Sequence, residues 1–275
     1  DTQRVRNNVQ NAVGNRPVDF IATRISPADL DEKLSNDLKP TEDVVWLYAG
    51  GDKQALILTR ETNGSRSYRY MPIANLRQNA NGKFSYELRD LSDGFPLRYF
   101  EDTMLNISGD RTTWLTNWHD EIEWLRGVHN TTYSNAIIGL TTQLDRHPSP
   151  RTENGTPDDD LIHRFRQRQR RMTEADLLIL ANNHWNFDVR GFNPGGNHGS
   201  FFRVSTNSTL MIAGGAKTGI RRSFVVSEPY DSLSFAPTIL NLMGKTDDEG
   251  NPTPELRARG FHRFPGRVIS EITGQ

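Results

Sequence analysis

Two histidines that are close in the sequence are the residues best suited to chemistry. His184 follows the apolar run of residues 177–181, and His198 is flanked by three glycines within residues 195–199. Neutral imidazole is a good ligand for Zn²⁺, and glycines open backbone conformations by which a loop holds one side chain against a metal ion or an anion. The pattern indicates a metal or anion site. A surface loop that happens to contain histidine is the alternative.

The position of these histidines depends on the strand expected at residues 177–181. In open α/β sheets, ligands collect at the carboxyl ends of strands, which is where the segment that carries His184 and His198 begins. After it we expect a strand at residues 209–215, a further strand, and a last helix over residues 234–244.

Four short elements follow one another in this part of the chain. They are Asn-Asn-His-Trp at 182–185, Gly-Asn-His-Gly at 196–199, Thr-Leu-Met-Ile-Ala-Gly-Gly at 209–215 and Ala-Pro-Thr-Ile-Leu-Asn-Leu-Met-Gly at 236–244. In this order they resemble the C-terminal part of the alkaline phosphatase superfamily, which includes phosphodiesterases, nucleotide pyrophosphatases and sulfatases. The resemblance covers about a quarter of the chain clearly, and a fainter likeness extends over about half of it.

The resemblance implies a two-metal centre that holds Zn²⁺ or Mn²⁺. His198 would bind one metal, His184 the other, and Asn183 stands beside His184 where the superfamily has a carboxylate. Two metals about 4 Å apart clamp the attacking and leaving oxygens of a phosphoryl group. The chain departs from the pattern at Trp185, which replaces a glycine, and at Ser234, which replaces an aspartate before the last helix.

The superfamily's nucleophile, a Thr or Ser at a helix N-terminus, and its first metal-binding Asp have no counterpart in the sequence, so no catalytic residue is assigned. We therefore expect the C-terminal portion of a metal-dependent hydrolase of small phosphate or sulfate esters. Its partner would be the N-terminal portion of the same protein, as a separate chain or a removed segment. The alternative is a catalytically degenerate scaffold with a binding or assembly role.

Composition excludes several other classes of protein. Of 275 residues, 33 are Lys or Arg and 34 are Asp or Glu, so the net charge of −1 argues against a nucleic-acid partner. The absence of cysteine excludes disulfides, thiolate metal sites and cysteine nucleophiles. No apolar stretch approaches the roughly 18 residues of a membrane-spanning helix. The missing cysteine, the first residue Asp1 and the superfamily's habits favour an exported protein.

The patterning predicts an α/β fold: a mixed sheet flanked by helices, alkaline-phosphatase-like, with a small antiparallel β insertion. We expect an α/β segment at residues 1–59, the insertion at 60–98, and helices followed by the C-terminal part of the α/β core at 99–275. The elements expected in the first segment are a short helix around 5–9, a helix at 26–33 and strands at 17–23, 43–48 and 54–59.

One longer helix is expected in the middle of the chain. Trp114, Trp118, Ile122 and Leu125 recur at spacings of four, four and three, which is the period of a buried helix face. His119 and His129 lie on or near this helix, and we interpret them as packing or capping groups rather than ligands.

Overall fold

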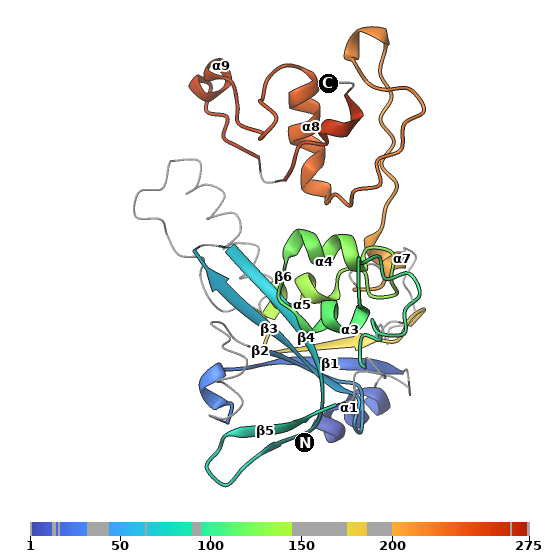
Figure 1. Ribbon diagram of the computed structural model, residues 1–275, viewed down its shortest axis with the longest axis vertical. Helices are drawn as coiled ribbons and strands as arrows, with labels where there is room; N and C mark the ends of the chain where they lie inside the picture. Colours follow the sequence, from blue (N-terminus) through green and yellow to red (C-terminus); the bar gives the residue numbers. More distant parts are fainter. Residues whose placement is uncertain are drawn as a thin grey trace. The chain divides into compact units, whose positions relative to one another are not determined.

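The structure is a computed structural model that describes residues 2–12, 15, 17–31, 44–63, 65–89, 95–144, 175–185, 200–264 and 266–273. The chain divides into two compact units (Figure 1). Unit 1 comprises Asp1–His147 and Thr173–Ser208, and unit 2 comprises Pro148–Met172 and Thr209–Gln275. Each unit is described by itself.

Unit 1 is built on one seven-stranded sheet. Its strands are β1 (Val18–Ile25), β2 (Val44–Tyr48), β3 (Gln54–Thr62), β4 (Ser65–Gln78), β5 (Phe84–Leu88), β6 (His119–Asp120) and β7 (Leu177–Ala181). The order is β5-β4-β3-β2-β1-β7, and β6 pairs with β4.

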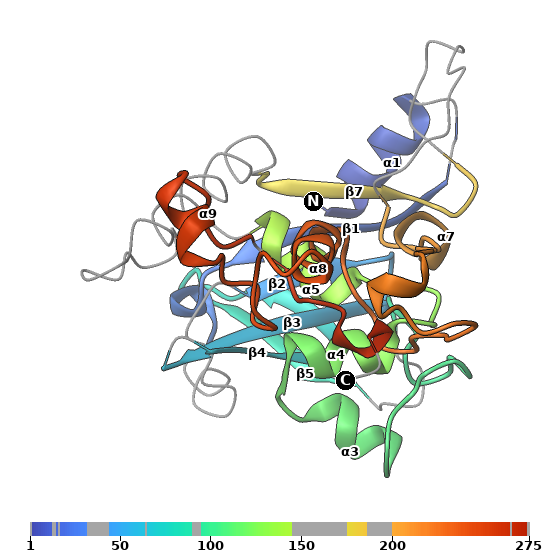
Figure 2. The same ribbon diagram turned by 90° about the horizontal axis from the view of Figure 1, so that it is seen from above.

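The sheet is antiparallel, so the expectation of a mixed sheet was wrong. Every pairing between the strands of the described residues is antiparallel, including that of β7 with β1, where Ile21 lies opposite Ile179. Figure 2 shows β7, in yellow, alongside β1. Strand β7 runs in the direction opposite to β1, so the C-terminal end of β7 lies beside the N-terminal end of β1.

The strands β2 to β5 follow one another along the chain through tight turns, so each is antiparallel to the next. The predicted hairpin of β2 and β3 is confirmed, and it closes where the Ala49 N–H donates to the Lys53 carbonyl at 2.8 Å. Strands β4 and β5 are also antiparallel, as expected for residues 60–98, but they continue the main sheet. They belong to the main sheet because β3 pairs with strands on both sides: Ile57 lies opposite Val45 of β2 and opposite Tyr70 of β4.

Helices cover one face of the sheet. They are α3 (Arg111–Thr116), α4 (Glu121–Val128) and α5 (Ala136–Leu144); α5 contacts β1, β2 and β3, and α4 contacts β4. The core beneath them includes the fully buried Tyr70, Tyr99 and Trp124. Unit 1 is therefore an α/β unit with an antiparallel sheet and flanking helices (Figure 1).

The other face of the sheet carries a smaller apolar cluster. Leu56 and Leu58 of β3 pack there with Leu30, and Phe84 of β5 packs against them. Leu30 follows a short 3₁₀ turn, η1 (Pro27–Asp29), which Ser26 caps by accepting from the Ala28 N–H at 3.3 Å. The helix expected over residues 26–33 is thus only this turn within the described residues 17–31.

The prediction of one helix that carries Trp114, Trp118, Ile122 and Leu125 was also wrong. Strand β6 separates α3 from α4, and α4 starts at a capping box: Asp120 accepts from the Glu123 N–H at 2.8 Å while Glu123 accepts from the Asp120 N–H at 3.0 Å. The break sends Trp118 to the smaller cluster, whereas Trp124 fills the main core.

Two further short helices lie at the ends of unit 1. Helix α1 (Thr2–Ala12) includes the helix expected around residues 5–9, and it is held to β1 by Arg6, whose guanidinium donates to the Val18 carbonyl at 2.8 Å. Helix α7 (Arg203–Thr206) begins shortly after residue 200, where the described part of the chain resumes. Among the described residues, none of the helices is long and apolar enough to cross a membrane.

Unit 2 contains α8 (Phe235–Leu242), α9 (Pro254–Ala258) and the 3₁₀ turns η3 (Ala216–Thr218), η4 (Ser232–Ser234) and η5 (Ser270–Ile272). The segment at 266–273 lies along α8, because the Ile269 N–H donates to Thr238 Oγ1 at 3.0 Å. The helix expected over 234–244 is confirmed for most of its length, because α8 covers residues 235–242 and η4 ends at residue 234.

The strand expected at residues 209–215, and the one after it, are not formed. Among the described residues of unit 2 the β interactions are two isolated bridges, Ile220 with Thr273 and Thr246 with Pro252. A strand needs a paired neighbour, and the apolar run at 209–213 has none among the described residues.

Candidate functional site

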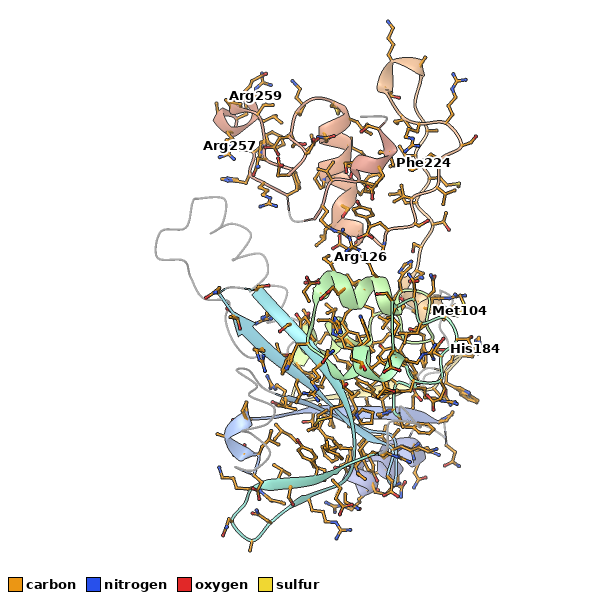
Figure 3. The ribbon with its side chains drawn as sticks, viewed as in Figure 1. Met104, Arg126, His184, Phe224, Arg257 and Arg259 are labelled. Carbon is orange, nitrogen blue, oxygen red and sulfur yellow. The ribbon has the colours of Figure 1, made fainter. Side chains whose placement is uncertain are left out.

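His184 and Asn183 lie in a tight turn at the end of β7. The turn is held by the Asn182 N–H, which donates to the Pro17 carbonyl at 3.0 Å, and by the Trp185 N–H, which donates to the Asn182 carbonyl at 3.0 Å. His184 has a left-handed backbone, with φ of 68°. Residues 182–185 are exposed, and Figure 3 labels His184.

The side chain of Asn183 is engaged within this turn. Its Oδ1, the atom that would bind a metal ion, accepts the His184 N–H at 3.0 Å. The side chain of Asn182 likewise accepts the Asn183 N–H at 2.8 Å. The turn therefore presents the His184 imidazole to its surroundings and directs the two amide oxygens to its own backbone.

The other predicted ligand, His198, lies outside the described residues. Among those that the structure describes, no group of three or more His, Asp or Glu side chains is arranged to hold a metal ion. The described part of the predicted donor set is one imidazole, His184, and one amide, Asn183, whereas catalytic zinc sites use three protein ligands.

A half-buried carboxyl lies where β7 ends. Asp19 sits at an irregularity in the pairing of β1 with β7, between Val18, which faces Ala181, and Phe20. Its Oδ2 accepts a hydrogen bond from the Tyr133 hydroxyl at 2.6 Å. Bulges of this kind re-aim a side chain and are frequent beside functional sites.

Burial is the main influence on this pair. It raises the pKa of Asp19 above its usual value, while the hydrogen bond from Tyr133 and the charge of Arg6 act in the opposite direction. Burial also raises the pKa of Tyr133, and the negative charge of Asp19 raises it further, so the phenol remains the donor. Asp19 can therefore bind or release a proton at a position that is partly removed from water, while Tyr133 keeps its own proton.

The described part of the chain resumes at residue 200, close to the same corner of unit 1. The ring of Phe202 packs on that of Tyr133, with 5.0 Å between centroids, and the Arg203 N–H donates to the Thr132 carbonyl at 2.9 Å. Since Asn182 is bonded to Pro17, both flanks of the segment that carries His198 are anchored close to the Asp19–Tyr133 pair.

Sequence reasoning missed Asp19 and Tyr133. The available signal was a single acidic residue among the otherwise apolar residues 18–22, and such a residue more often marks a solvent-facing position. The partner of Asp19 is 114 positions away in the chain, so only the fold shows that the carboxyl is covered.

The histidines interpreted as packing or capping groups have these roles. The imidazole of His119 stacks on Trp114 with 4.0 Å between centroids, and its Nε2 lies 2.8 Å from the Trp114 carbonyl. His129 is the C-terminal cap of α4, and its N–H donates to the Leu125 carbonyl at 2.9 Å. The His119 side chain therefore packs between α3 and α4, whereas His129 ends α4 through its backbone.

In unit 2, Ser234 occupies the position where the superfamily resemblance implies an aspartate. Its side chain is buried, and its Oγ accepts the Arg267 N–H at 3.2 Å. Asp231 caps the same turn by accepting the Leu233 N–H at 2.8 Å. Ser234 thus holds the C-terminal segment against α8.

Comparisons with known proteins add nothing to this geometry: no family model, no curated protein and no solved structure matches the chain.

Proposed function

We propose that the chain is the C-terminal portion of a metal-dependent hydrolase of phosphate or sulfate esters with an alkaline-phosphatase-like fold. The observation that carries the proposal is that Asn182 and Phe202 are both anchored at one corner of unit 1. These two residues flank the part of the sequence that contains both candidate ligands, His184 and His198. The order of the four sequence elements that resemble the superfamily supports the same assignment.

In this proposal the divalent metals, when bound, polarise the ester and stabilise the oxygens that gain charge. This chain's own contribution is to present imidazoles from the turn after β7 and from the segment that follows it. The N-terminal portion of the protein supplies the nucleophile and the remaining ligands, and the substrate is a small ester.

The second candidate is a scaffold that has lost its metals and serves binding or assembly. Two contacts favour it. The Asn183 amide oxygen is bonded to the His184 N–H, and Ser234 is bonded to Arg267 instead of offering a carboxylate.

A metal-dependent melting experiment separates the two candidates. The chain is heated with and without Zn²⁺ or Mn²⁺, and ligand at about 100 times its dissociation constant stabilises a folded protein by about 2.7 kcal/mol. For the hydrolase portion we expect the melting temperature to rise with metal and the rise to disappear in His198→Ala and His184→Ala.

His262→Ala, which removes a half-buried histidine of unit 2, is the matched control and should keep the rise. A melting temperature that neither metal changes would reject the metal site and leave the scaffold. The chain alone should not hydrolyse p-nitrophenyl phosphate or p-nitrophenyl sulfate, because the superfamily's nucleophile has no counterpart in its sequence.

A further inference from the structure

Two arginines lie on the face of the sheet that carries the smaller apolar cluster. Arg60 of β3 lies opposite Ser67 of β4, and Arg69 of β4 lies opposite Leu58 of β3. Leu58 belongs to the smaller cluster, and side chains two residues apart in a strand, or directly opposite in a pair, share one face. Arg60 and Arg69 are therefore diagonal neighbours on that face, within reach of each other.

Neither of these arginines has an acidic partner among the residues that the structure describes. Their guanidinium groups form no hydrogen bond or ion pair there, and Nε of Arg69 is buried without a hydrogen-bond partner. The nearby Arg66 differs, because its Nε lies 3.5 Å from Oε2 of Glu61. A buried cationic donor without an acceptor is costly, so it needs an explanation.

The surroundings of Arg69 disfavour its positive charge. Burial is the main cause that lowers the pKa of its guanidinium, the interaction with Tyr86 acts in the opposite direction, and the positive charge of Arg60 lowers the pKa further. Arginine nevertheless keeps its proton in proteins. Two like charges therefore lie close together, and an anion between them would reduce their repulsion and satisfy the buried Nε.

An aromatic ring holds Arg60 in place. The central carbon of its guanidinium lies 4.1 Å from the centroid of the Trp118 ring, and Trp118 packs against the smaller apolar cluster. A guanidinium stacked on a ring keeps its N–H groups at the edge available for a ligand. Because the side chain is already restrained, binding costs less conformational entropy.

One acidic residue lies nearby in the sheet, but its carboxylate has another role. Asp120 of β6 is opposite Ser67 of β4. Its Oδ1 accepts the Glu123 N–H at 2.8 Å as the cap of α4. Asp120 therefore stabilises the start of a helix and forms no ion pair with Arg60 or Arg69.

We propose that Arg60 and Arg69 bind a small, doubly charged tetrahedral oxyanion, such as phosphate, sulfate or the phosphate group of a monoester. Guanidinium groups bind such anions through paired N–H donors. Two guanidinium groups match two negative charges, whereas a carboxylate would neutralise only one. A nucleic acid fits less well, because the net charge of the chain is −1. This site does not rest on the proposed function, because the metal site uses other residues.

Titration calorimetry tests the proposal. Inorganic phosphate and sulfate are titrated into the chain in the presence of EDTA and at constant ionic strength. We expect saturable one-to-one binding of both, and at least tenfold weaker binding of acetate, which carries a single charge. Phenyl phosphate distinguishes the two sources of the anion: tighter binding than that of inorganic phosphate identifies an ester, and equal binding identifies the free ion. Either result supports the site.

Variants of the two arginines locate the bound anion. Arg60→Gln and Arg69→Gln should each raise the dissociation constant for phosphate at least tenfold, and Arg60→Lys should raise it severalfold, because lysine keeps the charge but lacks the planar fork. Arg77→Gln is the matched control: Arg77 is an exposed arginine of β4 outside the pair, and its change should leave the dissociation constant unchanged. Circular dichroism checks the folding of each variant. If Arg69→Gln does not fold, the two variants of Arg60 decide.

Several results would overturn the proposal. They are no binding of phosphate, equally tight binding of acetate, unchanged binding in Arg60→Gln, and loss of binding in Arg77→Gln, which would indicate a general effect of charge. Phosphate binding that requires Zn²⁺ or disappears in His184→Ala would assign the anion to the proposed metal site instead. Conversely, binding that persists in His184→Ala, together with no metal-dependent rise in melting temperature, contradicts the proposed function and supports the arginine site.

Discussion

At the scale of single residues, the Asp19–Tyr133 pair is the most informative contact. It joins the start of β1 to the segment before α5 through one short hydrogen bond between side chains. Asp19 is half-buried, and this burial is the main reason why its pKa is raised and its ionised form is disfavoured in the folded protein.

The first prediction concerns the pH dependence that Asp19 confers. Its pKa is raised above 3.8 in the folded state, so the folded protein binds the proton more tightly than the unfolded chain does. The resulting stabilisation is fully present below pH 3.8 and is lost as the pH rises through the raised pKa. Asp19→Asn keeps an acceptor for Tyr133 and removes this titration.

We therefore expect the difference in free energy of unfolding, Asp19→Asn minus wild type, to be more positive at pH 7 than at pH 4. Urea unfolding at both pH values measures it. A difference for Asp19→Asn that does not change with pH would contradict the burial of this carboxyl.

Sequence reasoning at this scale placed His184 correctly after a strand, because a short apolar run ending in polar residues is a local signal. That His184 and His198 bind metal stays a prediction. Asp19 could not be found, since its burial depends on Tyr133, which is distant in the chain.

At the scale of elements, helix α5 packs closely against the segment before α7. A Cβ added at Gly139 would lie 2.5 Å from Cε1 of Phe201, whose ring is buried. Glycine therefore permits this contact even though it is a weak helix former.

The second prediction is that Gly139→Ala lowers the stability of unit 1. Overpacking of this kind costs about 1–3 kcal/mol, and the better helix propensity of alanine returns up to about 1 kcal/mol. We expect a net loss of about 1 kcal/mol in urea unfolding. The control is Gly215→Ala, where no atom lies within 4 Å of the new Cβ. Equal stabilities of the two variants would show that the Phe201 ring moves aside freely.

The third prediction concerns the start of α4. Asp120→Ala removes the acceptor for the Glu123 N–H and should cost about 1 kcal/mol. Asp120→Asn retains an acceptor oxygen and should cost much less. Thermal unfolding of the two variants measures the difference, and similar losses would mean that the capping box does not hold the end of α4.

Strands β1, β2, β3 and β7 were predictable because each has a local apolar pattern, whereas β6 fell within the predicted tryptophan-rich helix. The tryptophan-rich helix was not predictable, because a periodic pattern does not reveal that Asp120 starts a new helix. The prediction of a strand at 209–215 was wrong for a different reason. Its residues suit a strand, but a strand also needs a neighbouring strand to pair with, and its own sequence does not show whether one exists.

At the scale of the whole molecule, the two units differ in how they are stabilised. Unit 1 has a large apolar core, whereas unit 2 relies on hydroxyl and backbone contacts between α8 and residues 266–273. The five tryptophans, at positions 46, 114, 118, 124 and 185, all belong to unit 1. Tryptophan fluorescence therefore reports on unit 1, and the two units can be followed separately.

The fourth prediction uses this difference. Gly266 has φ of 113°, and a Cβ there would lie 2.5 Å from the Leu233 carbonyl carbon. Gly266→Ala should therefore loosen the C-terminal segment, so that hydrogen exchange at Ile269 speeds up at least tenfold. The midpoint of unfolding followed by tryptophan fluorescence should stay unchanged. A shift of that midpoint would show that the stability of unit 1 depends on unit 2.

The pairing of β1 with β7 has a consequence for how the protein is made. One edge of β1 receives its neighbour only after residues 177–181 have left the ribosome, long after β2 can pair with the other edge. Until then the nascent chain carries an unpaired strand edge that includes Phe20 and Ile21, and this edge is where we expect a holding chaperone to act.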